Sequence, residues 1–372
     1  MANPPLTGLR IVEMAGIGPG PFAGMMLADH GAEVIRIDRP AKGGITIDAK
    51  DPLLRSRRSI ALDLKRPESI AAVRRIVAGA DGLIEGFRPG VMERLGLGPD
   101  VLIGENPRLV YGRMTGWGQT GPMAQEPGHD INYIAISGAL HAYGRAGEQP
   151  TPPINMVGDF GGGAMMLAFG MLAAILDAQR TGRGQVVDAA MTDGSALLMS
   201  MIWGFRGMGR WTGARGTNLL DTGAHFYDTY ETADGKWVSL GAIEPQFYAA
   251  LRGVMGLDET KWDAQFDPRG WVGLKAELAD RFRTRTRDAW VAAFAGHDVC
   301  FAPVLDFDEA LVDPHNVARA TFVEAGGVTQ PAPAPRYSKS ETVDPVMAGE
   351  RNDREVLRGL GFTDEEAAAL GH

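Results

Sequence analysis

The N-terminal third of the chain alternates short hydrophobic runs with longer amphipathic stretches. The runs have the length of buried strands and lie at residues 9–13, 33–38, 60–64, 82–85 and 109–113. The stretches 21–30 and 67–78 between them have the spacing of amphipathic helices. Strands that alternate with helices are typical of a parallel sheet covered by helices, so we expect an α/β fold.

A charge-free run, residues 164–176, predicts a buried helix that is shorter than the roughly 20 apolar residues needed to cross a bilayer. Asp159 and the glycines Gly161–Gly163 precede it. An aspartate before a helix is typical of an N-cap. Glycines inside a helix each cost roughly 1 kcal/mol relative to alanine. They are better explained if a ligand approaches the backbone closely at the positive end of the helix.

A final strand at 185–191 and a helix at 192–203 complete the first unit, and a second unit follows. It has paired strands around the Asp234-Gly235 turn, helices at 245–255, 274–283 and 287–295, and a strand at 301–305 that starts the return. The proline-rich segment 330–335 is expected to be an extended link back to the first unit. We therefore expect a large domain, a linker, a small α+β domain and a C-terminal return to the large domain, with bounds 1–205, 206–224, 225–320 and 321–372.

Composition and charge restrict the function. A hydrophobic fraction of 45% and a charged fraction of 22% are those of a globular protein. The net charge of −9 argues against nucleic acid as a partner. Lysine and arginine nevertheless exceed acidic residues between Arg36 and Arg94, which suits a compact polyanionic ligand.

Cysteine usage and targeting signals indicate the compartment. Cys300 is the only cysteine, so an intrachain disulfide and a cysteine metal site are excluded. Its neighbours Val299 and Phe301 predict a buried thiol. No signal peptide pattern is visible, and we expect a cytoplasmic protein without a membrane partner.

Four cations, Arg39, Lys65, Arg88 and Arg94, follow predicted strands. Ligands of open α/β sheets bind beyond the carboxyl ends of the strands, so these side chains are candidates for holding phosphates; solvated surface charge is the alternative. The loop Gly16–Pro21 does not fit a dinucleotide site, because Pro21 stands where the third glycine is needed. Zinc-protease, Walker and serine-hydrolase motifs are also missing, so zinc catalysis, nucleotide hydrolysis and serine-hydrolase activity have no support in the sequence. We therefore expect no metal and no redox cofactor.

Three further residues are candidates for chemistry, and each has an ordinary structural alternative. His129 could be a hydrogen-bonded core histidine, Asp159 a helix cap, and Glu244 an acidic residue in the first turn of a helix.

Motifs along most of the chain resemble one family. They are LRIVEMAGIGPGP, RIDRP, ALDLK, IEGFRPGVMERLGLGP, RMTGWGQTGP, GHDINY, NMVGDFGGG, GQVVDAAM and GAIEPQFY. The chain resembles the alpha-methylacyl-CoA racemases of the family III CoA-transferase superfamily, and GHDINY with GDFGGG is typical of the racemase branch. The resemblance implies a Rossmann-like CoA domain, a smaller domain and an interlocked homodimer.

The resemblance also implies roles for residues. His129 and Asp159 are the two acid/base groups on opposite faces of the substrate alpha carbon, and Glu244 supports His129. Coenzyme A is part of the thioester substrate, so no separate cofactor is implied. The residues that match the family's CoA-contacting segments are Arg39, Leu62, Asp63, Leu64, Lys65, Gly86, Phe87, Arg88, Pro89, Gly90, Arg94, Gly128, Asp130, Ile131, Asn132 and Tyr133.

The implied reaction interconverts (R)- and (S)-2-methylacyl-CoA thioesters by 1,1-proton transfer through an enolate. Inversion needs one proton donor or acceptor on each face of the carbon, which an imidazole and a carboxylate supply. The alternative is a CoA-transferase in which Asp159 is a nucleophile, and His129 then lacks a role. The non-enzymatic alternative is an acyl-CoA-binding protein that uses only the basic region.

Overall fold

The computed structural model describes residues 3–40, 50–211, 213–348 and 352–372, which form two compact units. The first unit contains residues 1–137, 154–198 and 320–372, and the second contains 138–153 and 199–319. Residues 138–153 and 199–205 therefore group with the second unit and not with the large domain expected to end at 205. One reason is that Arg145 binds both carboxylate oxygens of Asp228, at 3.1 and 3.0 Å.

The first unit is built on a six-stranded parallel sheet, which confirms the expected α/β fold. The strand order is β3-β2-β1-β4-β5-β6, so the chain changes direction across the sheet between β1 and β4. Ligands of such sheets bind where this change separates neighbouring loops. The strands are β1 (Arg10–Met14), β2 (Glu33–Asp38), β3 (Arg58–Ala61), β4 (Gly82–Glu85), β5 (Val110–Thr115) and β6 (Val186–Ala190).

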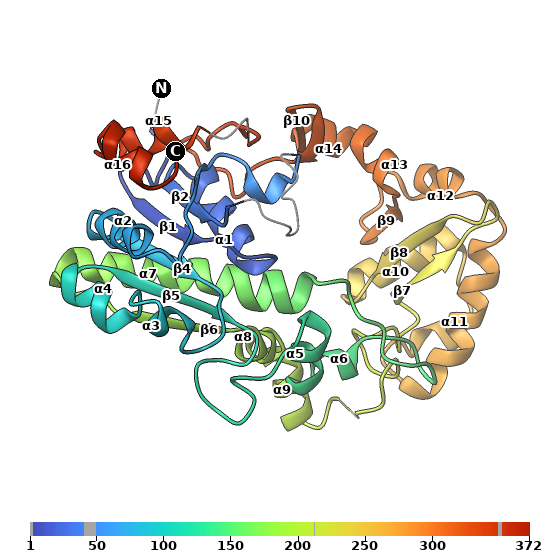
Figure 1. The fold of residues 1–372 in the computed structure, drawn as a ribbon. Coiled ribbons are helices and arrows are strands. Elements are labelled where there is room, and N and C mark those ends of the chain that lie inside the picture. The colour runs from blue at the N-terminus through green and yellow to red at the C-terminus, as the bar shows by residue number, and fades with distance from the viewer. Residues whose placement is uncertain (1–2, 41–49, 212, 349–351) are drawn as a thin grey trace. The chain divides into compact units, whose positions relative to one another are not determined.

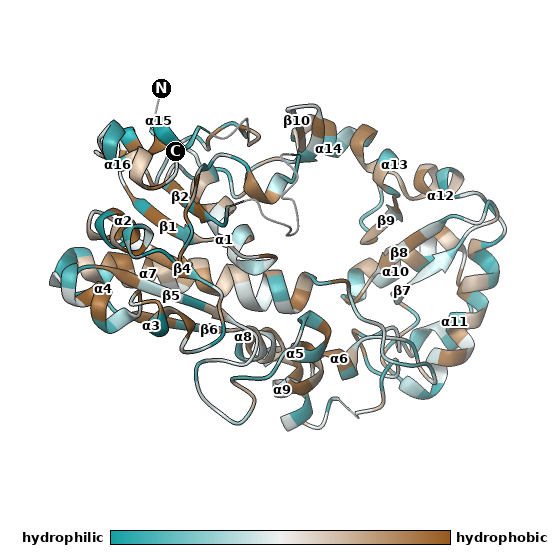
Figure 2. Ribbon diagram, viewed as in Figure 1, coloured by the Kyte–Doolittle hydropathy of each residue, from teal (hydrophilic) through white to brown (hydrophobic). Residues whose placement is uncertain are grey.

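Helices cover both faces of the sheet because alternate strand residues point to opposite sides. Ile11 packs with α1 (Pro19–Asp29) and α7 (Met166–Thr181). Val12 packs on the other face, which is covered by the helices α2 (Pro67–Ala78), α4 (Pro99–Glu105), α15 (Asp353–Gly359) and α16 (Asp364–Ala369). The C-terminal helices, drawn in red, thus return beside the blue N-terminal strands (Figure 1). On α2, both hydrophobic and hydrophilic residues are visible, as in an amphipathic helix (Figure 2).

The helix that contains Asp159 begins earlier than the sequence predicts. A π-helix (Met156–Met165) continues without a break into α7, so Asp159 lies inside a helix and its interpretation as an N-cap is wrong. The combined helix, Met156–Thr181, is long and apolar enough to cross a membrane, but a helix buried in a protein core meets the same criterion. Here it packs on the sheet through buried residues such as Leu167 and Met171.

The glycines after Asp159 serve helix packing and not the approach of a ligand. A Cβ atom on Gly162 would lie 2.6 Å from the backbone nitrogen of Ser195, and one on Gly163 would lie 2.8 Å from Met191. Both neighbours belong to α8 (Met191–Leu198), where Gly194 meets the carbonyl of Gly162. The expectation that these glycines open the backbone to a ligand is therefore wrong, because another helix fills the space.

The second unit contains a small antiparallel sheet of β7 (Tyr227–Glu231), β8 (Trp237–Gly241) and β9 (Phe301–Val304). Aromatic side chains dominate its core, among them Phe226, Trp262 and Phe282. Its other described elements are the 3-10 helix η3 (Thr260–Asp263) and the helices α6 (Ala139–Ala142), α9 (Ser200–Gly207), α10 (Pro245–Met255), α11 (Pro268–Phe282), α12 (Arg287–Phe294), α13 (Phe307–Val312) and α14 (Pro314–Ala318).

Three expectations about the later part of the chain are corrected. Residues 301–304 do not start the return, because β9 pairs with β8. The segment expected to be a simple extended link begins inside a hairpin of β10 (Phe322–Ala325) and β11 (Val328–Pro331). Cys300 is exposed and not buried: its φ of 55° places the residue in a left-handed bend just before β9.

Candidate active site

A cavity of about 1800 Å³ opens at the carboxyl edge of the parallel sheet. Its wall is formed by the segments that follow four strands: Gly16–Gly20 after β1, Asp38–Pro40 after β2, Gly86–Pro89 after β4 and Thr115–Trp117 after β5. All of its lining residues belong to the first unit. The cavity therefore lies where the strand order predicts a ligand.

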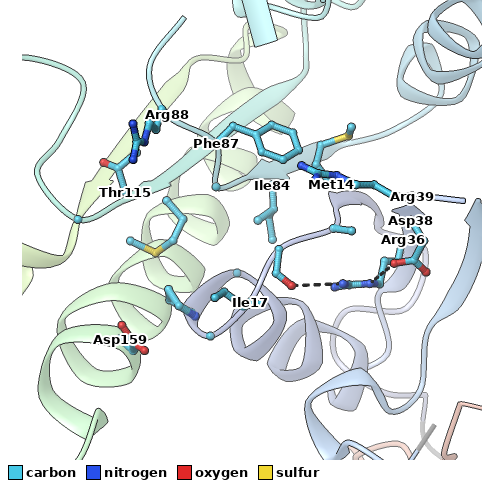
Figure 3. Close-up of a pocket in the computed structure, with 18 of the residues that line it drawn as sticks. Met14, Ile17, Arg36, Asp38, Arg39, Ile84, Phe87, Arg88, Thr115 and Asp159 are labelled. Atoms are coloured by element: carbon cyan, nitrogen blue, oxygen red, sulfur yellow. Dashed lines mark hydrogen bonds and ion pairs between the residues drawn. The ribbon is translucent and has the colours of Figure 1, made fainter. Parts of the chain in front are cut away.

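The two ends of this cavity differ in chemistry. Arg36, Asp38 and Arg39 lie at one end and Asp159 at the other, with the apolar side chains of Met14, Ile84 and Phe87 between them (Figure 3). Positive charge at one end suits an anionic group of a ligand, and the carboxylate at the other end is a group that can exchange a proton.

Two of the predicted cations at the cavity have no acidic partner among the residues that the structure describes. Neither Arg39 nor Arg88 forms an ion pair with any residue of the described ranges, whereas Arg36 is paired with Glu13 and Asp38. An unpaired guanidinium beside a cavity is ready to bind a phosphate through charge-assisted hydrogen bonds.

Asp159 is half-buried, and the pKa of its carboxyl group is raised above the usual range. Burial is the main cause, because it disfavours the charged form, and the negative charge of Asp130 adds to it. A hydrogen bond of 3.0 Å from Asn155 Nδ2 to Asp159 Oδ2 and the charge of His129 act in the opposite direction. Asp159 is thus placed to hold a proton or to release it.

His129 precedes α5 (Asp130–Ile136), and its side chain is exposed at the cavity. Its backbone N–H donates to Asn132 Oδ1 at 3.0 Å, which fixes the start of the helix. Tyr133 donates its hydroxyl to the carbonyl of Gly128 and packs edge-on against Trp117, at 4.7 Å between ring centres. The tyrosine therefore holds the backbone directly before His129.

Asp130 links the helices of the two candidate acid/base residues. Its side chain is 5% exposed, and its Oδ1 accepts a hydrogen bond of 2.8 Å from the backbone N–H of Asp159. A side chain at Gly158 would collide with this carboxylate, so glycine is needed there.

Part of the predicted residue set lines the cavity. These residues are His129 and Asp159, together with Arg39, Gly86, Phe87, Arg88, Pro89, Gly128, Asn132 and Tyr133. Residues far apart in the sequence meet here because each follows a strand of the same sheet or belongs to a helix packed on it.

The other predicted residues lie outside the cavity lining. Leu62 is fully buried in the core under α2, so its side chain does not reach a ligand in the cavity. Lys65 and Arg94 are exposed at the surface. The rest of this group is Asp63, Leu64, Gly90, Asp130 and Ile131.

Glu244 belongs to the second unit, where it stands immediately before α10. Its predicted support of His129 remains a prediction.

Sequence reasoning missed several residues of the site. Asn155 lies four residues before Asp159, a spacing that brings side chains together only if the helix already begins there. Asn352 and Glu355 reach the cavity from the C-terminal return, and no local signal in the sequence marks them.

Glu85 is another buried acidic residue near the cavity that sequence reasoning did not single out. It lies 3.5 Å from Arg113 and accepts a hydrogen bond of 2.7 Å from the backbone N–H of Phe87. Burial raises the pKa of Glu85 to about 7, although this hydrogen bond and Arg113 lower it. The residue holds the start of the loop that carries Arg88.

Comparison with known proteins agrees with this architecture. The alpha-methylacyl-CoA racemase of Mus musculus is 47% identical to this chain, with 98% of this chain and 96% of the mouse protein covered. The human alpha-methylacyl-CoA racemase is 44% identical with the same coverage. A CaiB/BaiF family protein from Brucella suis has the same fold, with a TM-score of 0.82, 24% identity and coverage of 96% of this chain and 100% of that chain.

These similarities confirm the resemblance found in the sequence motifs. Residues 6–345 of this chain match the model of CoA-transferase family III. The chain therefore belongs to CoA-transferase family III, with alpha-methylacyl-CoA racemases among its relatives.

Proposed function

We propose that this protein interconverts (R)- and (S)-2-methylacyl-CoA thioesters by 1,1-proton transfer. The observation that carries the proposal is that His129 and Asp159 line one cavity whose far end carries Arg39, which forms no ion pair with any residue of the described ranges. The relatives that are alpha-methylacyl-CoA racemases support the same reaction.

The proposed reaction removes the alpha proton of the thioester on one face and returns a proton on the other. In one direction neutral His129 is the base and protonated Asp159 is the acid, and the opposite direction reverses these roles. A positioned acid or base contributes about 10²–10⁴-fold to such a step. The raised pKa of Asp159 supports the scheme, because it makes the protonated carboxyl group, which acts as the acid, easier to form.

The intermediate enolate needs hydrogen-bond donors at its oxygen. The glycines after Asp159, which the sequence suggested for this role, pack against α8 and are not assigned to it.

The anionic part of coenzyme A is assigned to the end of the cavity that carries Arg39, and Arg88 is the second candidate contact. The apolar stretch of Met14, Ile84 and Phe87 between this end and Asp159 suits the less polar part of the ligand.

A second copy of the chain is the proposed partner. Met165, Phe169 and Leu176 on one side of the combined helix are 49%, 72% and 56% exposed, and Leu197 on α8 is 59% exposed. Exposed apolar residues at this helical spacing favour a protein interface. Phe169→Glu should convert a dimer into a monomer in light scattering, and a wild-type monomer would contradict the proposal.

The function is tested by NMR of (S)-2-methylacyl-CoA with the enzyme in D₂O, without an acyl acceptor. Exchange of the alpha hydrogen with inversion of configuration is the expected result. The alternative, a CoA-transferase, predicts no exchange but movement of CoA once a free carboxylic acid is added. An acyl group trapped on Asp159 by hydroxylamine would then identify that carboxylate as a nucleophile.

A further inference from the structure

A carboxylate and two guanidinium groups are buried together at the wall of the cavity, which both arginines line. Glu13 on β1 stands opposite Arg36 on β2 in the sheet register, and the two side chains form an ion pair. Arg57, which precedes β3, forms an ion pair with the second oxygen of the same carboxylate. The three side chains are at most 3% exposed.

Helix α1 lies directly over this network. A Cβ atom on Gly24 would collide with Glu13 Oε2 and would lie 2.9 Å from Arg57 Nη1. Only glycine therefore lets the helix approach the three charged groups this closely.

The network holds the Gly16–Pro21 loop, whose last three residues form the first turn of α1. Arg36 Nη2 donates to the carbonyl of Gly16 at 3.3 Å, and Arg57 Nη2 donates to the carbonyl of Pro21 at 2.9 Å. Arg36 is itself oriented by a hydrogen bond of 2.9 Å from its Nε to Asp38. The backbone from Gly16 to Pro21 is thus held at two points by hydrogen bonds from the two arginines.

Between these two points the loop touches the reactive end of the cavity. Gly18 has a φ of +65°, and a Cβ atom there would lie 3.1 Å from Asp159 Oδ2. Phe22, which follows the loop, stacks on Phe160 with 4.7 Å between ring centres. A shift of the loop therefore changes the space around the Asp159 carboxylate.

Three charges removed from water are an inefficient way to stabilise a fold, because their desolvation offsets much of their attraction. We infer that Glu13, Arg36 and Arg57 are positioning residues for proton transfer: they hold the Gly16–Pro21 loop against Asp159. The inference rests on the proposed function. Since errors of about 1 Å in placement cost up to about 100-fold in rate, the network acts on turnover more than on binding.

The test compares two buried carboxylates of the first unit. Glu13→Gln is expected to lower kcat for alpha-hydrogen exchange of (S)-2-methylacyl-CoA by about 10- to 100-fold, with KM within about threefold. Asp29→Asn is the control, because Asp29 also pairs with a buried arginine, Arg55, but that arginine binds Gln330 and Pro331 of the C-terminal return in place of the Gly16–Pro21 loop. It should lower the melting temperature and leave the kcat of the folded enzyme unchanged.

Unchanged kcat in folded Glu13→Gln would overturn the inference, as would an equal loss of kcat in Asp29→Asn. Arg57→Lys serves if Glu13→Gln does not fold: it keeps the charge beside Glu13 and removes the bond to Pro21. A fall in kcat of about 3- to 10-fold at constant KM is expected, and wild-type kcat would contradict the inference. If the wild-type enzyme transfers CoA and does not exchange the alpha hydrogen, the proposed function fails, and the same variants are compared by their transfer rates.

Discussion

The two units of the chain place their buried polar groups in different surroundings. The first unit contains ion pairs in which both members are buried, such as Glu13–Arg36 and Asp29–Arg55. In the second unit the buried Asp228 is bound by Arg145 and Lys275, whose side chains are 43% and 25% exposed. The second unit also buries an imidazole, His225, among aromatic rings.

This difference shows where each unit needs positional accuracy. Buried ion pairs have few alternative geometries, and in the first unit they lie beside the cavity loop and under the C-terminal return, where Arg55 also binds Gln330. The core of the second unit consists mainly of packed aromatic side chains, and such packing depends less on the direction of individual hydrogen bonds and ion pairs. Accordingly, we expect chemistry to depend on the first unit and acid sensitivity to be pronounced in the second.

The largest expected effect is the loss of turnover when either acid/base residue of the first unit is removed. His129→Ala and Asp159→Asn should each lower kcat by about 10²–10⁴-fold in the exchange assay, because in each variant one face of the alpha carbon lacks its proton carrier. Cys300→Ser in the second unit is the control and should keep wild-type kcat. Losses below tenfold in both site variants would refute the two-base assignment.

The stabilities of two variants test whether ion pairs with both members buried contribute more to folding than ion pairs with exposed cations. Asp29→Asn should lower the free energy of unfolding by about 3–5 kcal/mol, because it leaves the Arg55 guanidinium buried without a counter-charge. Asp228→Asn should cost clearly less, since water reaches both of its cationic partners. Urea denaturation measures both, and equal losses would remove the distinction between the two units.

The buried imidazole of His225 is expected to make the stability of the second unit sensitive to acid. Its Nε2 lies 2.8 Å from the hydroxyl of Tyr248, and burial lowers the pKa of the imidazole from 6.5 to about 4, with Lys275 adding to the shift. The unfolded chain binds a proton near pH 6.5 while the folded one does not, so stability is lost as pH falls from about 6.5 to about 4. The loss is on the order of 3 kcal/mol at pH 4.

The variant His225→Gln checks this pH dependence. Glutamine keeps a group that can bond to Tyr248 but does not titrate, so its free energy of unfolding should vary less between pH 7 and pH 4 than that of the wild type. Parallel pH curves for the two proteins would show that acid sensitivity arises elsewhere.

The smallest expected effect concerns the cations at the cavity. Arg88→Ala should weaken substrate binding by about 1–3 kcal/mol, seen as a higher KM at nearly constant kcat, because a charge-assisted bond to phosphate is lost. Arg74→Ala is the matched control, since Arg74 is paired with Glu105 and lies outside the cavity lining. A fall in kcat at unchanged KM would count against phosphate binding by Arg88.

Local sequence signals predicted the elements that carry their own start and stop residues. The strands 33–38 and 82–85 and the helices 67–78 and 245–255 have the bounds expected from their hydrophobic spacing, and both helices begin with proline. The motifs that carry the family resemblance are also local, which is why residues such as His129 and Asp159 could be named in advance.

Only the tertiary structure decided which residues share surroundings. The sequence suggested that Asp159 caps a helix, but the helix begins at Met156, three residues before Asp159. The sequence also suggested that the following glycines face a ligand, but α8 occupies that side. Likewise Leu62 belongs to the core, Cys300 is exposed, and Asn352 reaches the cavity from the far end of the chain. Hydrophobic periodicity specifies the faces of single elements, whereas the neighbours of each face depend on contacts between residues distant in sequence.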